Sequence, residues 1–345
     1  MGIALVSGGA GFLGSHLVDH LLARDLSVRV LDNLSTGSLR NLQRAADGQA
    51  PSAGPAERPL PPSNGRRLEL MVGDVRDERL VRRAMQHVEY VFHLAALPAV
   101  VTGAISPKDM HGVNVQGTLN VLQAATAEGV RRVVFASCAS VYGTADAAAV
   151  SEDVAPAPRT MFAASKLAGE IYCRTHERAY GLETVVLRYF AVYGPRQSGL
   201  EGALVPTLIQ QLRSRRRPTV VGDARTAQDL MYADDAVTAT IAAALRPEAA
   251  GRTINVASGH SASTIEVLDI LNRLLRTEAV PRLVRPRAGY APAPRAGTAL
   301  AQELLGCAPR VSLVAGLARA VEAVSEGDED GLLAEIGSGE ERSHL

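Results

Sequence analysis

Short apolar runs alternate with stretches of helical periodicity through the first 190 residues of the chain. The apolar runs predict six strands, at residues 2–7, 27–32, 68–73, 90–93, 132–137 and 183–188. The stretches between them predict helices at residues 14–23, 77–85, 113–128 and 164–180. Strands that alternate with helices are typical of a parallel sheet with helices on both faces. We therefore expect an α/β fold, with a doubly wound parallel sheet formed by residues 1–190.

The pattern becomes irregular after Gly194, where helices are expected near residues 205–213, 233–245 and 263–275. This part of the chain, residues 191–325, predicts a smaller C-terminal lobe that binds substrate. Residues 45–66 are rich in Pro, Gly, Ala and Ser and lack apolar periodicity, which predicts a flexible surface loop. Residues 326–345 are acidic and Gly-rich, which predicts a disordered tail.

Composition narrows the class of protein. The chain has 345 residues, of which 47% are hydrophobic and 21% charged, as in ordinary globular proteins. Its formal net charge is zero, which gives no electrostatic reason to expect nucleic acid or an anionic membrane as a partner. The cysteines, Cys138, Cys173 and Cys307, are odd in number and lack metal-ligand spacing. Because the sequence shows no secretory signal and no apolar run of the ~18 residues that cross a bilayer, we expect a reduced, cytoplasmic protein.

A glycine-rich turn follows the first predicted strand and opens the first helix. Its glycines are Gly8, Gly11 and Gly14, and it includes Phe12 and Leu13. Glycine permits the tight turn, the approach of the backbone to a pyrophosphate and the close packing of helix on strand. The amide groups at the helix N-terminus then attract the phosphates. The turn predicts a dinucleotide site of the Rossmann type.

The second predicted strand ends at Asp32, which indicates the identity of the dinucleotide. A carboxylate at this place accepts both ribose hydroxyls of NAD and repels the 2′-phosphate of NADP, so NAD is the expected cofactor. Further contacts are expected at the ribose, at the adenine and beyond the fourth strand, from Asn33, Ser35, Asp74, Val75, Leu94, Ala95 and Ala96.

Lys166 follows Phe162 by four residues, so both side chains lie on one face of a predicted helix. The chain has only one other lysine, Lys108, among many arginines, so Lys166 is expected to have a specific role. A tyrosine four residues before such a lysine would have its phenol pKa lowered and could act as a base. Phe162 has the same ring without the oxygen. The sequence thus predicts much of a nicotinamide redox site while the expected proton acceptor is absent.

Further motifs lie along the chain, at residues 31–33, 73–74, 93–96, 114–118, 140–143, 164–166, 192–196 and 255–259. Together with the glycine turn, they resemble the extended short-chain dehydrogenase/reductase family. Within it they are most similar to the nucleotide-sugar epimerases and dehydratases, in particular to enzymes like UDP-galactose 4-epimerase. The resemblance covers about residues 3–322.

The resemblance implies an oxidation chemistry. Members of the family keep NAD bound and remove a hydride from a sugar carbon, usually C4, while a tyrosine anion takes the hydroxyl proton and a Ser or Thr assists. Lys166 matches the family lysine, which positions the ribose and lowers the tyrosine pKa, and so counts as both a catalytic and a cofactor residue. Phe162 replaces the tyrosine, and Cys138 replaces the Ser or Thr.

The resemblance also implies a nucleotide-diphosphate sugar as substrate. The corresponding binding residues are Ser140, Ala191, Val205, Arg225, Gln228 and Arg287. Two of these depart from the family, since Ala191 replaces an Asn and Gln228 replaces an Arg that holds the diphosphate. Arg225 stands three residues before Gln228 as a possible substitute, and Tyr290 replaces the acid that usually follows Arg287.

Three explanations account for the missing tyrosine oxygen, because loss of a positioned base slows a reaction by about two to four powers of ten. In the first, which we favour, the enzyme is active and Cys138 is the reassigned base, since a thiol pKa of about 8.5 drops beside cations such as Lys166. The competing interpretation of Cys138 is a small buried cysteine without a catalytic role. In the second explanation the chain is a pseudoenzyme that binds NAD or a sugar nucleotide without redox activity. In the third, Phe162 is an engineered substitution that traps substrate in an otherwise active epimerase.

The predicted helices at 113–128 and 164–180 match the pair through which members of the family form homodimers, so a homodimer is expected. Both helices carry apolar residues on more than one face, namely Val121, Leu122, Ala125, Leu167, Ile171 and Tyr172. The alternative is that these faces pack only against the chain's own sheet.

Overall fold

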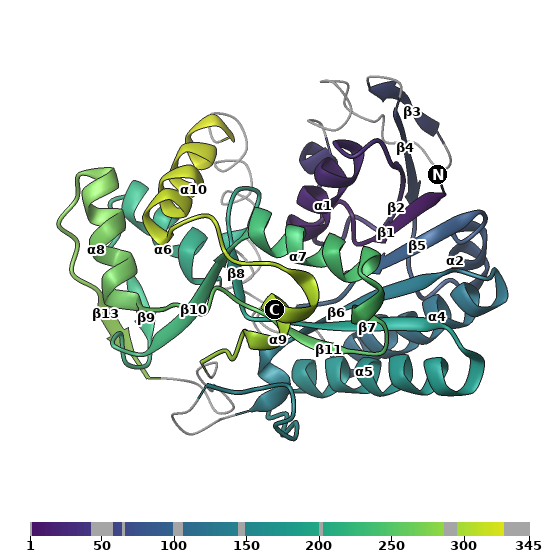
Figure 1. Ribbon diagram of the computed structural model, residues 1–345. Helices are drawn as coiled ribbons and strands as arrows, with labels where there is room; N and C mark the ends of the chain where they lie inside the picture. Colours follow the sequence, from purple (N-terminus) through teal and green to yellow (C-terminus); the bar gives the residue numbers. More distant parts are fainter. Residues whose placement is uncertain are drawn as a thin grey trace, which may run out of the picture.

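The computed structural model describes residues 2–42, 58–63, 66–98, 106–143, 149–199, 203–285 and 295–327. Its largest unit is an eight-stranded sheet with the order β11-β7-β6-β5-β1-β2-β4-β3 (Figure 1). The strands are β1 (Ile3–Ser7), β2 (Ser27–Asp32), β3 (Arg58–Ser63), β4 (Arg66–Val72), β5 (Val88–His93), β6 (Arg132–Cys138), β7 (Glu183–Tyr189) and β11 (Thr253–Val256). Seven of these run parallel, and β3 pairs antiparallel with β4 at one edge. The fold class is α/β, as the sequence predicts.

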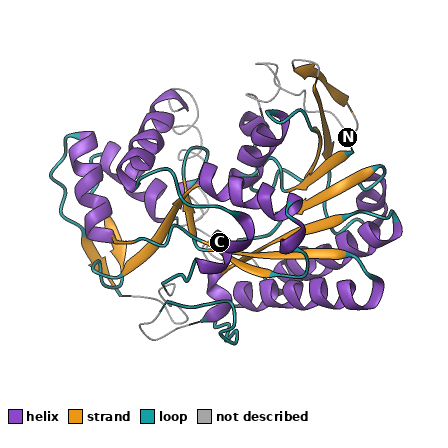
Figure 2. Ribbon diagram, viewed as in Figure 1, coloured by secondary structure: helices purple, strands orange, loops and turns teal. Residues whose placement is uncertain are grey.

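Helices cover both faces of this sheet (Figure 2). Side chains alternate along a strand, so Ala4 and Val6 of β1 point into one core and Leu5 points into the other. The first core is closed by α1 (Phe12–Leu22), α7 (Ala233–Leu245) and α9 (Ala299–Leu305). The second core is closed by α2 (Glu78–Ala84), α4 (Gly117–Ala127) and α5 (Met161–Tyr180). Before α4 come α3 (Pro107–His111) and a π-helical turn, Gly112–Gln116.

The first six predicted strands are all present, with ends that differ by no more than two residues. The structure nevertheless differs from the sequence prediction in two places. Part of the loop expected at residues 45–66 is the edge strand β3, while residues 43–57 and 64–65 lie outside the described residues. The chain also does not leave the sheet for good at residue 190, because β11 pairs with β7 and α7 packs against the sheet. A single boundary at residue 190 therefore does not separate the lobes. The return of the chain has a physical reason, because β11 covers an edge of β7 that would otherwise be unpaired.

The second lobe contains two small sheets. One consists of β8 (Ala191–Tyr193), β10 (Ala227–Tyr232) and β12 (Ser261–Ser263), and the other of β9 (Thr219–Val221) and β13 (Arg282–Val284). The helices α6 (Leu204–Arg213), α8 (Thr264–Leu275) and α10 (Leu313–Gly327) pack on them around a core that includes Leu208, Val267 and Leu317. Residues 328–345, most of the predicted tail, lie outside the described residues.

Part of the expected dimer face belongs to the interior. Val121, Leu122 and Ala125 of α4 are fully buried in the second core, because α4 lies with its apolar stripe on the sheet. Their assignment to an interface is therefore wrong. On α5, by contrast, the side chain of Ile171 is 52% exposed, and Tyr172 is only partly buried.

The described part of the chain contains neither a membrane-spanning helix nor a group of metal ligands. No helix there is long and apolar enough to cross a membrane. No group of three or more His, Cys, Asp or Glu side chains within these residues could hold a metal ion.

Candidate cofactor and active site

The three glycines of the turn between β1 and α1 differ in how much space a side chain would have. Gly8 has a φ of +76°, and a Cβ atom there would lie 2.7 Å from the amide nitrogen of Ala95. A Cβ at Gly14 would lie 2.0 Å from the carbonyl oxygen of Gly8. At Gly11 a Cβ would meet only that oxygen, at 3.2 Å. The fold therefore requires Gly8 and Gly14, whereas the absence of a side chain at Gly11 leaves room for a ligand.

A groove of about 240 Å³ follows the carboxyl ends of β1, β2, β4 and β5. It is lined by most of the predicted cofactor residues: Gly8, Gly11, Phe12, Leu13, Gly14, Asp32, Asn33, Ser35, Val75, Leu94, Ala95 and Ala96. Residues that the sequence had not assigned to the cofactor line it too: Leu31, Thr36, Gly73, Leu97, Pro98, Val113, Ala136 and Phe162. Asp74 and Lys166 are the predicted cofactor residues that do not line the groove. An elongated ligand that approaches the glycine turn and ends beside Phe162 fits this shape, and NAD is such a ligand.

Asp32 is held by the backbone at the end of β2. Its Oδ2 accepts a hydrogen bond from the amide of Ala10 at 2.9 Å, and its Oδ1 accepts one from the amide of Leu34 at 2.8 Å. Burial raises the pKa of the carboxyl, and the two amide bonds oppose this rise. Each oxygen keeps a second lone pair, so the carboxylate is oriented and able to accept from ribose hydroxyls.

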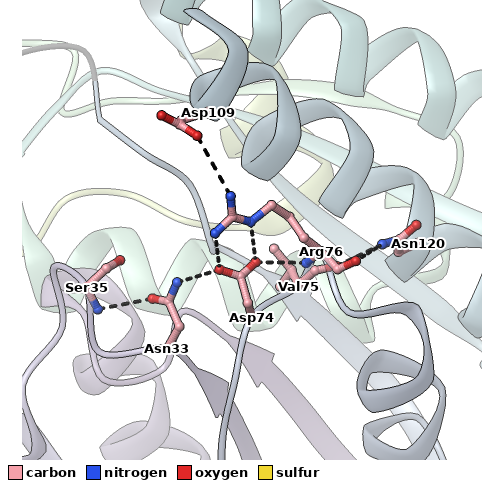
Figure 3. Close-up of polar contacts among 7 residues, drawn as sticks. All are labelled: Asn33, Ser35, Asp74, Val75, Arg76, Asp109 and Asn120. Carbon is pink, nitrogen blue, oxygen red and sulfur yellow. Dashed lines mark hydrogen bonds and ion pairs between the residues drawn. The ribbon is translucent and has the colours of Figure 1, made fainter. Parts of the chain in front are cut away.

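Asp74, expected beside the adenine, is engaged by the protein itself (Figure 3). Its Oδ1 accepts from the amide and Nε of Arg76, both at 2.9 Å. Its Oδ2 accepts from Nη2 of Arg76 at 2.9 Å and from Nδ2 of Asn33 at 2.8 Å. These bonds, above all that from the Arg76 guanidinium, lower the pKa of Asp74. With four donors, the carboxylate of Asp74 is satisfied without a ligand. Of the two residues predicted to flank the adenine, only Val75 lines the groove.

Phe162 lies in the first turn of α5, with its ring on the groove. The helix is capped by Thr160, whose hydroxyl accepts from the amide of Ala163 at 3.1 Å. The hydroxyl of Ser165 donates to the carbonyl of Phe162 at 2.7 Å. Phe162 thus lines the groove with a side chain that carries no group able to accept a proton.

One turn further along α5, Lys166 is buried, with 3% of its surface exposed. Its Nζ lies 4.5 Å from the centroid of the Phe135 ring. Among the described residues, Lys166 has no hydrogen-bond or ion-pair partner. Burial lowers the pKa of Lys166 to about 8, so that both the charged and the neutral amine are populated near neutral pH.

Cys138 ends β6, and its Sγ lies 2.8 Å from Oγ of Ser140. Burial raises the pKa of the thiol, and this effect exceeds the lowering by the Ser140 hydrogen bond and by the charge of Lys166. The expected decrease of the Cys138 pKa beside a cation is therefore wrong, because desolvation of the thiolate outweighs the nearby charge. Cys138 is a neutral thiol at neutral pH and can act as a hydrogen-bond donor or acceptor.

His93 is the central residue of a buried polar network that the sequence analysis had not predicted. Its Nδ1 lies 2.7 Å from Oγ of Ser7, and its Nε2 lies 2.9 Å from Oγ1 of Thr118. Because the Thr118 hydroxyl donates to the carbonyl of Asn114, it is left to accept from Nε2–H. Burial lowers the pKa of His93 to about 3, and the charge of Lys166 contributes. His93 is therefore a neutral residue that joins β1, β5 and α4 behind the groove.

Asn114 extends this network to α5. Its Oδ1 accepts from the amide of Leu97 at 2.8 Å, and its Nδ2 donates to Ser165 at 3.0 Å and to the carbonyl of Leu97 at 3.1 Å. Since Leu97 lines the groove, Asn114 couples the position of that wall to the helix that carries Phe162 and Lys166. The sequence marked Asn114 within a motif, but its partners are far apart in the chain and could not be read from it.

The structure distributes the predicted substrate residues unevenly. Ser140 is exposed beside Cys138, Ala191 lies on β8, and Gln228 lies on β10 where the strand pairs with β12. Arg225 is exposed in the turn before β10. Val205 is only 2% exposed and packs in the core of the second lobe, so its side chain offers no contact surface to a substrate. Arg287 lies outside the described residues.

Two tyrosines near the site are bound within the protein. The hydroxyl of Tyr142 donates to Oδ1 of Asn255 at 2.7 Å, and burial raises its pKa. Tyr193 is buried in the second lobe, and burial raises its pKa as well. Neither is a phenolate near neutral pH.

The parallel sheet, the glycine turn and Asp32 at the end of β2 define a dinucleotide-binding protein of the Rossmann class. The model of the NAD dependent epimerase/dehydratase family matches residues 4–257, and the chain belongs to this family. UDP-glucose 4-epimerase of Mycolicibacterium smegmatis is 34% identical over 321 residues, which cover 92% of this chain and 97% of that protein.

Solved structures agree with this assignment. The UDP-glucose 4-epimerase of Thermus thermophilus in complex with NAD superposes with a TM-score of 0.81 and 30% identity, over 94% of this chain and 99% of that one. A Tyr-to-Phe mutant of UDP-glucuronic acid 4-epimerase from Bacillus cereus, in complex with NAD and a fluorinated UDP-sugar, gives a TM-score of 0.83 and 27% identity. The match covers 94% of this chain and 99% of the mutant.

Proposed function

We propose that this chain keeps NAD bound in the groove and acts on nucleotide-diphosphate sugars by transient oxidation at C4, as an epimerase or a dehydratase. The observation that carries this proposal is the run of predicted cofactor residues along one groove that ends beside Phe162. Gly11 would approach the pyrophosphate and Asp32 the adenosine ribose, and NAD, when bound, supplies the hydride acceptor. The names of the related proteins, which are UDP-sugar epimerases, support the substrate class.

The proton of the sugar hydroxyl needs a residue other than Phe162. We assign it to Lys166, which is buried, has no partner among the described residues and has a pKa of about 8 owing to that burial. The thiol of Cys138 and the hydroxyl of Ser140, 2.8 Å apart, then orient the sugar by hydrogen bonds. This division of roles replaces the expectation that Cys138 is the base, because burial raises the pKa of its thiol.

A pseudoenzyme is the second candidate, and Phe162 favours it because the ring retains the shape of the site without its acid/base group. The neighbour that carries a Tyr-to-Phe mutation holds both NAD and a UDP-sugar, which supports binding in the absence of a tyrosine hydroxyl. Such a chain would bind both ligands through the same groove and transfer no hydride.

Two measurements separate these candidates. Mass spectrometry of small molecules that copurify with the protein should detect NAD together with a nucleotide sugar. Incubation with UDP-, dTDP- and GDP-sugars, followed by NMR of the sugar ring, should show inversion at C4 or loss of water. Bound ligands without any turnover would establish the pseudoenzyme, and turnover that appears only with Phe162→Tyr would point to an engineered or lost tyrosine.

We also propose a homodimer, formed by the outer faces of α4 and α5. A shallow groove there is lined by Leu119, Gln123, Thr126, Ala127, Tyr172, Thr175, His176, Ala179 and Tyr180. The side chains of Ile171 and Tyr180, on the same helix, are 52% and 64% exposed. Apolar surface of this kind favours association. A cytoplasmic location is proposed as well, and the three free cysteines support it.

A further inference from the structure

The second lobe ends in two adjacent loops. One follows α6 (residues 214–218) and the other follows α8 (residues 276–281). Arg217 joins them, because its Nε donates to the carbonyl of Val280 at 3.1 Å and its Nη2 to that of Pro281 at 3.3 Å. Figure 1 shows the loop between α8 and β13 on the outer edge of the lobe, on the side away from the eight-stranded sheet. This surface is separate from the cofactor groove.

Exposed arginines gather on these loops and at the helix and strand ends beside them: Arg215, Arg216, Arg217, Arg273, Arg276, Arg282 and Arg285. Within the part of the chain that the structure describes, none of these seven forms an ion pair with a carboxylate. The net charge of the chain is zero, but among the described residues of these two loops the only acidic side chain is that of the exposed Glu278. We call these seven residues the arginine patch.

Two of the arginines have a backbone conformation that is unfavourable for any residue with a Cβ atom. Arg215 and Arg276 both have a φ of +53°, in the left-handed region. Each of the two residues lies just after its helix, which ends in a Schellman motif. After α6 the amide of Arg216 donates to the carbonyl of Gln211, and after α8 the amide of Thr277 donates to the carbonyl of Asn272. Glycine is the favoured residue at this position because it has no Cβ. An arginine at both equivalent positions suggests that the charge, rather than the turn, is needed.

Apolar side chains are exposed among the arginines. Val280 is 67% exposed, Leu283 57% and Leu274 37%. Isolated exposed aliphatic residues are normal on a protein surface, but here Val280 lies on the loop after α8, and Leu274 and Leu283 lie at the ends of α8 and β13 beside it, next to the arginines.

We propose that the arginine patch docks the protein on an anionic lipid bilayer. The guanidinium groups bind headgroup phosphates, and the three aliphatic side chains enter the interface between headgroups and acyl chains. A nucleic acid would neutralise the arginines but offers nothing for exposed aliphatic residues, and no aromatic residue for base stacking lies on these described loops. The charge of the whole chain conceals this surface, which is why composition alone argued against a membrane partner.

Sedimentation of the full chain with vesicles tests the proposal. The protein should pellet with vesicles of phosphatidylcholine and phosphatidylglycerol, stay in solution with phosphatidylcholine alone, and be released by salt. Arg215→Gly with Arg276→Gly should lower the partition coefficient about fivefold for each arginine while leaving the resistance to urea unchanged or higher. Val280→Ser with Leu283→Ser should weaken binding to the same vesicles without changing the charge.

Arg24→Gly with Arg252→Gly is the matched control, because both are exposed loop arginines on the other lobe, and it should bind vesicles like the wild type. Equal loss of binding in this control, or equal binding to neutral and anionic vesicles, would overturn the proposal. It would also be overturned if the wild type bound a single-stranded oligonucleotide but no vesicles. Vesicle binding that appeared only after removal of residues 328–345, which are rich in Asp and Glu, would show that this segment occupies the patch instead.

Discussion

A Cβ atom at Gly11 would meet one backbone oxygen at 3.2 Å, whereas at Gly8 it would press on Ala95 at 2.7 Å in a backbone with φ of +76°. Gly11→Ala should therefore lower NAD affinity at least tenfold, since the methyl group takes the space of the pyrophosphate, and change the free energy of unfolding by less than ~1 kcal/mol. Calorimetric titration with NAD and urea unfolding measure the two effects. Gly8→Ala is the control, and it should lose stability. Unchanged NAD affinity in Gly11→Ala would place the pyrophosphate elsewhere.

The missing phenol leads to a second prediction at this scale. Phe162→Tyr restores a hydroxyl in the groove close to Lys166, and turnover should rise by about two to four powers of ten, the usual effect of a positioned base. Cys138→Ala should reduce turnover much less, because the thiol is neutral and only orients the sugar. Both variants are compared in the C4 inversion assay. If Cys138→Ala removed most of the activity while Phe162→Tyr added none, the thiol would be the base after all.

Lys166 predicts a pH dependence of stability whose sign can be worked out. Burial lowers its folded pKa to about 8, below the ordinary 10.5, so the unfolded chain holds the proton more tightly. The unfolding free energy therefore falls as pH decreases from 10.5 to 8, and below pH 8 the full destabilisation by the buried charge of Lys166 is present. Lys166→Met should stabilise cofactor-free protein at pH ~7 by up to roughly 3 kcal/mol, and the gain should vanish above pH ~10.5.

Urea unfolding across this pH range makes the measurement. Lys108, the only other lysine, is exposed on α3, so Lys108→Met is the control and should show no such dependence. A stability difference for Lys166→Met that stayed constant with pH would mean that packing, rather than charge, is responsible.

Most of the groove could be predicted because its residues lie at strand ends or directly after them in the sequence, as Asp32 lies at the end of β2. The state of a side chain could not be predicted where it depends on distant partners. One of the four donors to Asp74 is Nδ2 of Asn33, which lies 41 residues away. The pKa of Cys138 depends on the balance of burial against the charge of Lys166, and the sequence shows the charge but not the burial.

At the scale of elements, the strands of the first lobe could be predicted from the sequence, whereas the short strands of the second lobe could not. The strands of the first lobe are five to seven residues long in most cases, long enough for an apolar run to be recognised. Strands such as β8, β9, β12 and β13 have three residues each and carry no periodicity that a sequence reveals. The last strand of the main sheet, β11, has four residues and is separated from its neighbour β7 by most of the second lobe, so its return could not be anticipated.

The face of α4 and α5 allows a test of association. Ile171→Glu places a charge on a half-exposed apolar position, and the protein should become a monomer at micromolar concentration, because an unpaired charge in the interface is costly to desolvate. Light scattering coupled to size exclusion measures the mass. Leu245→Glu is the matched control, since Leu245 is 51% exposed at the end of α7, and it should remain dimeric. A monomeric wild type would exclude this interface.

In the whole molecule, the cofactor groove draws its walls from segments that are distant in the chain. It runs from the turn after β1 past the ends of β2, β4 and β5 to Phe162 on α5. The network of His93 and Asn114 ties β1, β5 and α4 to this same helix. A ligand in the groove therefore contacts both the early and the late parts of the sheet, and its binding energy is linked to the stability of the entire first lobe.

This linkage yields the last prediction, in which NAD stabilises the chain and NADP does not. A ligand that binds only the folded state adds about 2.7 kcal/mol to the unfolding free energy at a concentration of 100 times its dissociation constant. Saturating NAD should therefore raise the melting temperature of cofactor-stripped protein by several degrees, while NADP should leave it unchanged, because Asp32 would face the 2′-phosphate. Differential scanning calorimetry makes the comparison, and Asp32→Ala should reduce the preference by removing the repelling charge. Equal stabilisation by the two dinucleotides in the wild type would show that Asp32 does not contact the ribose.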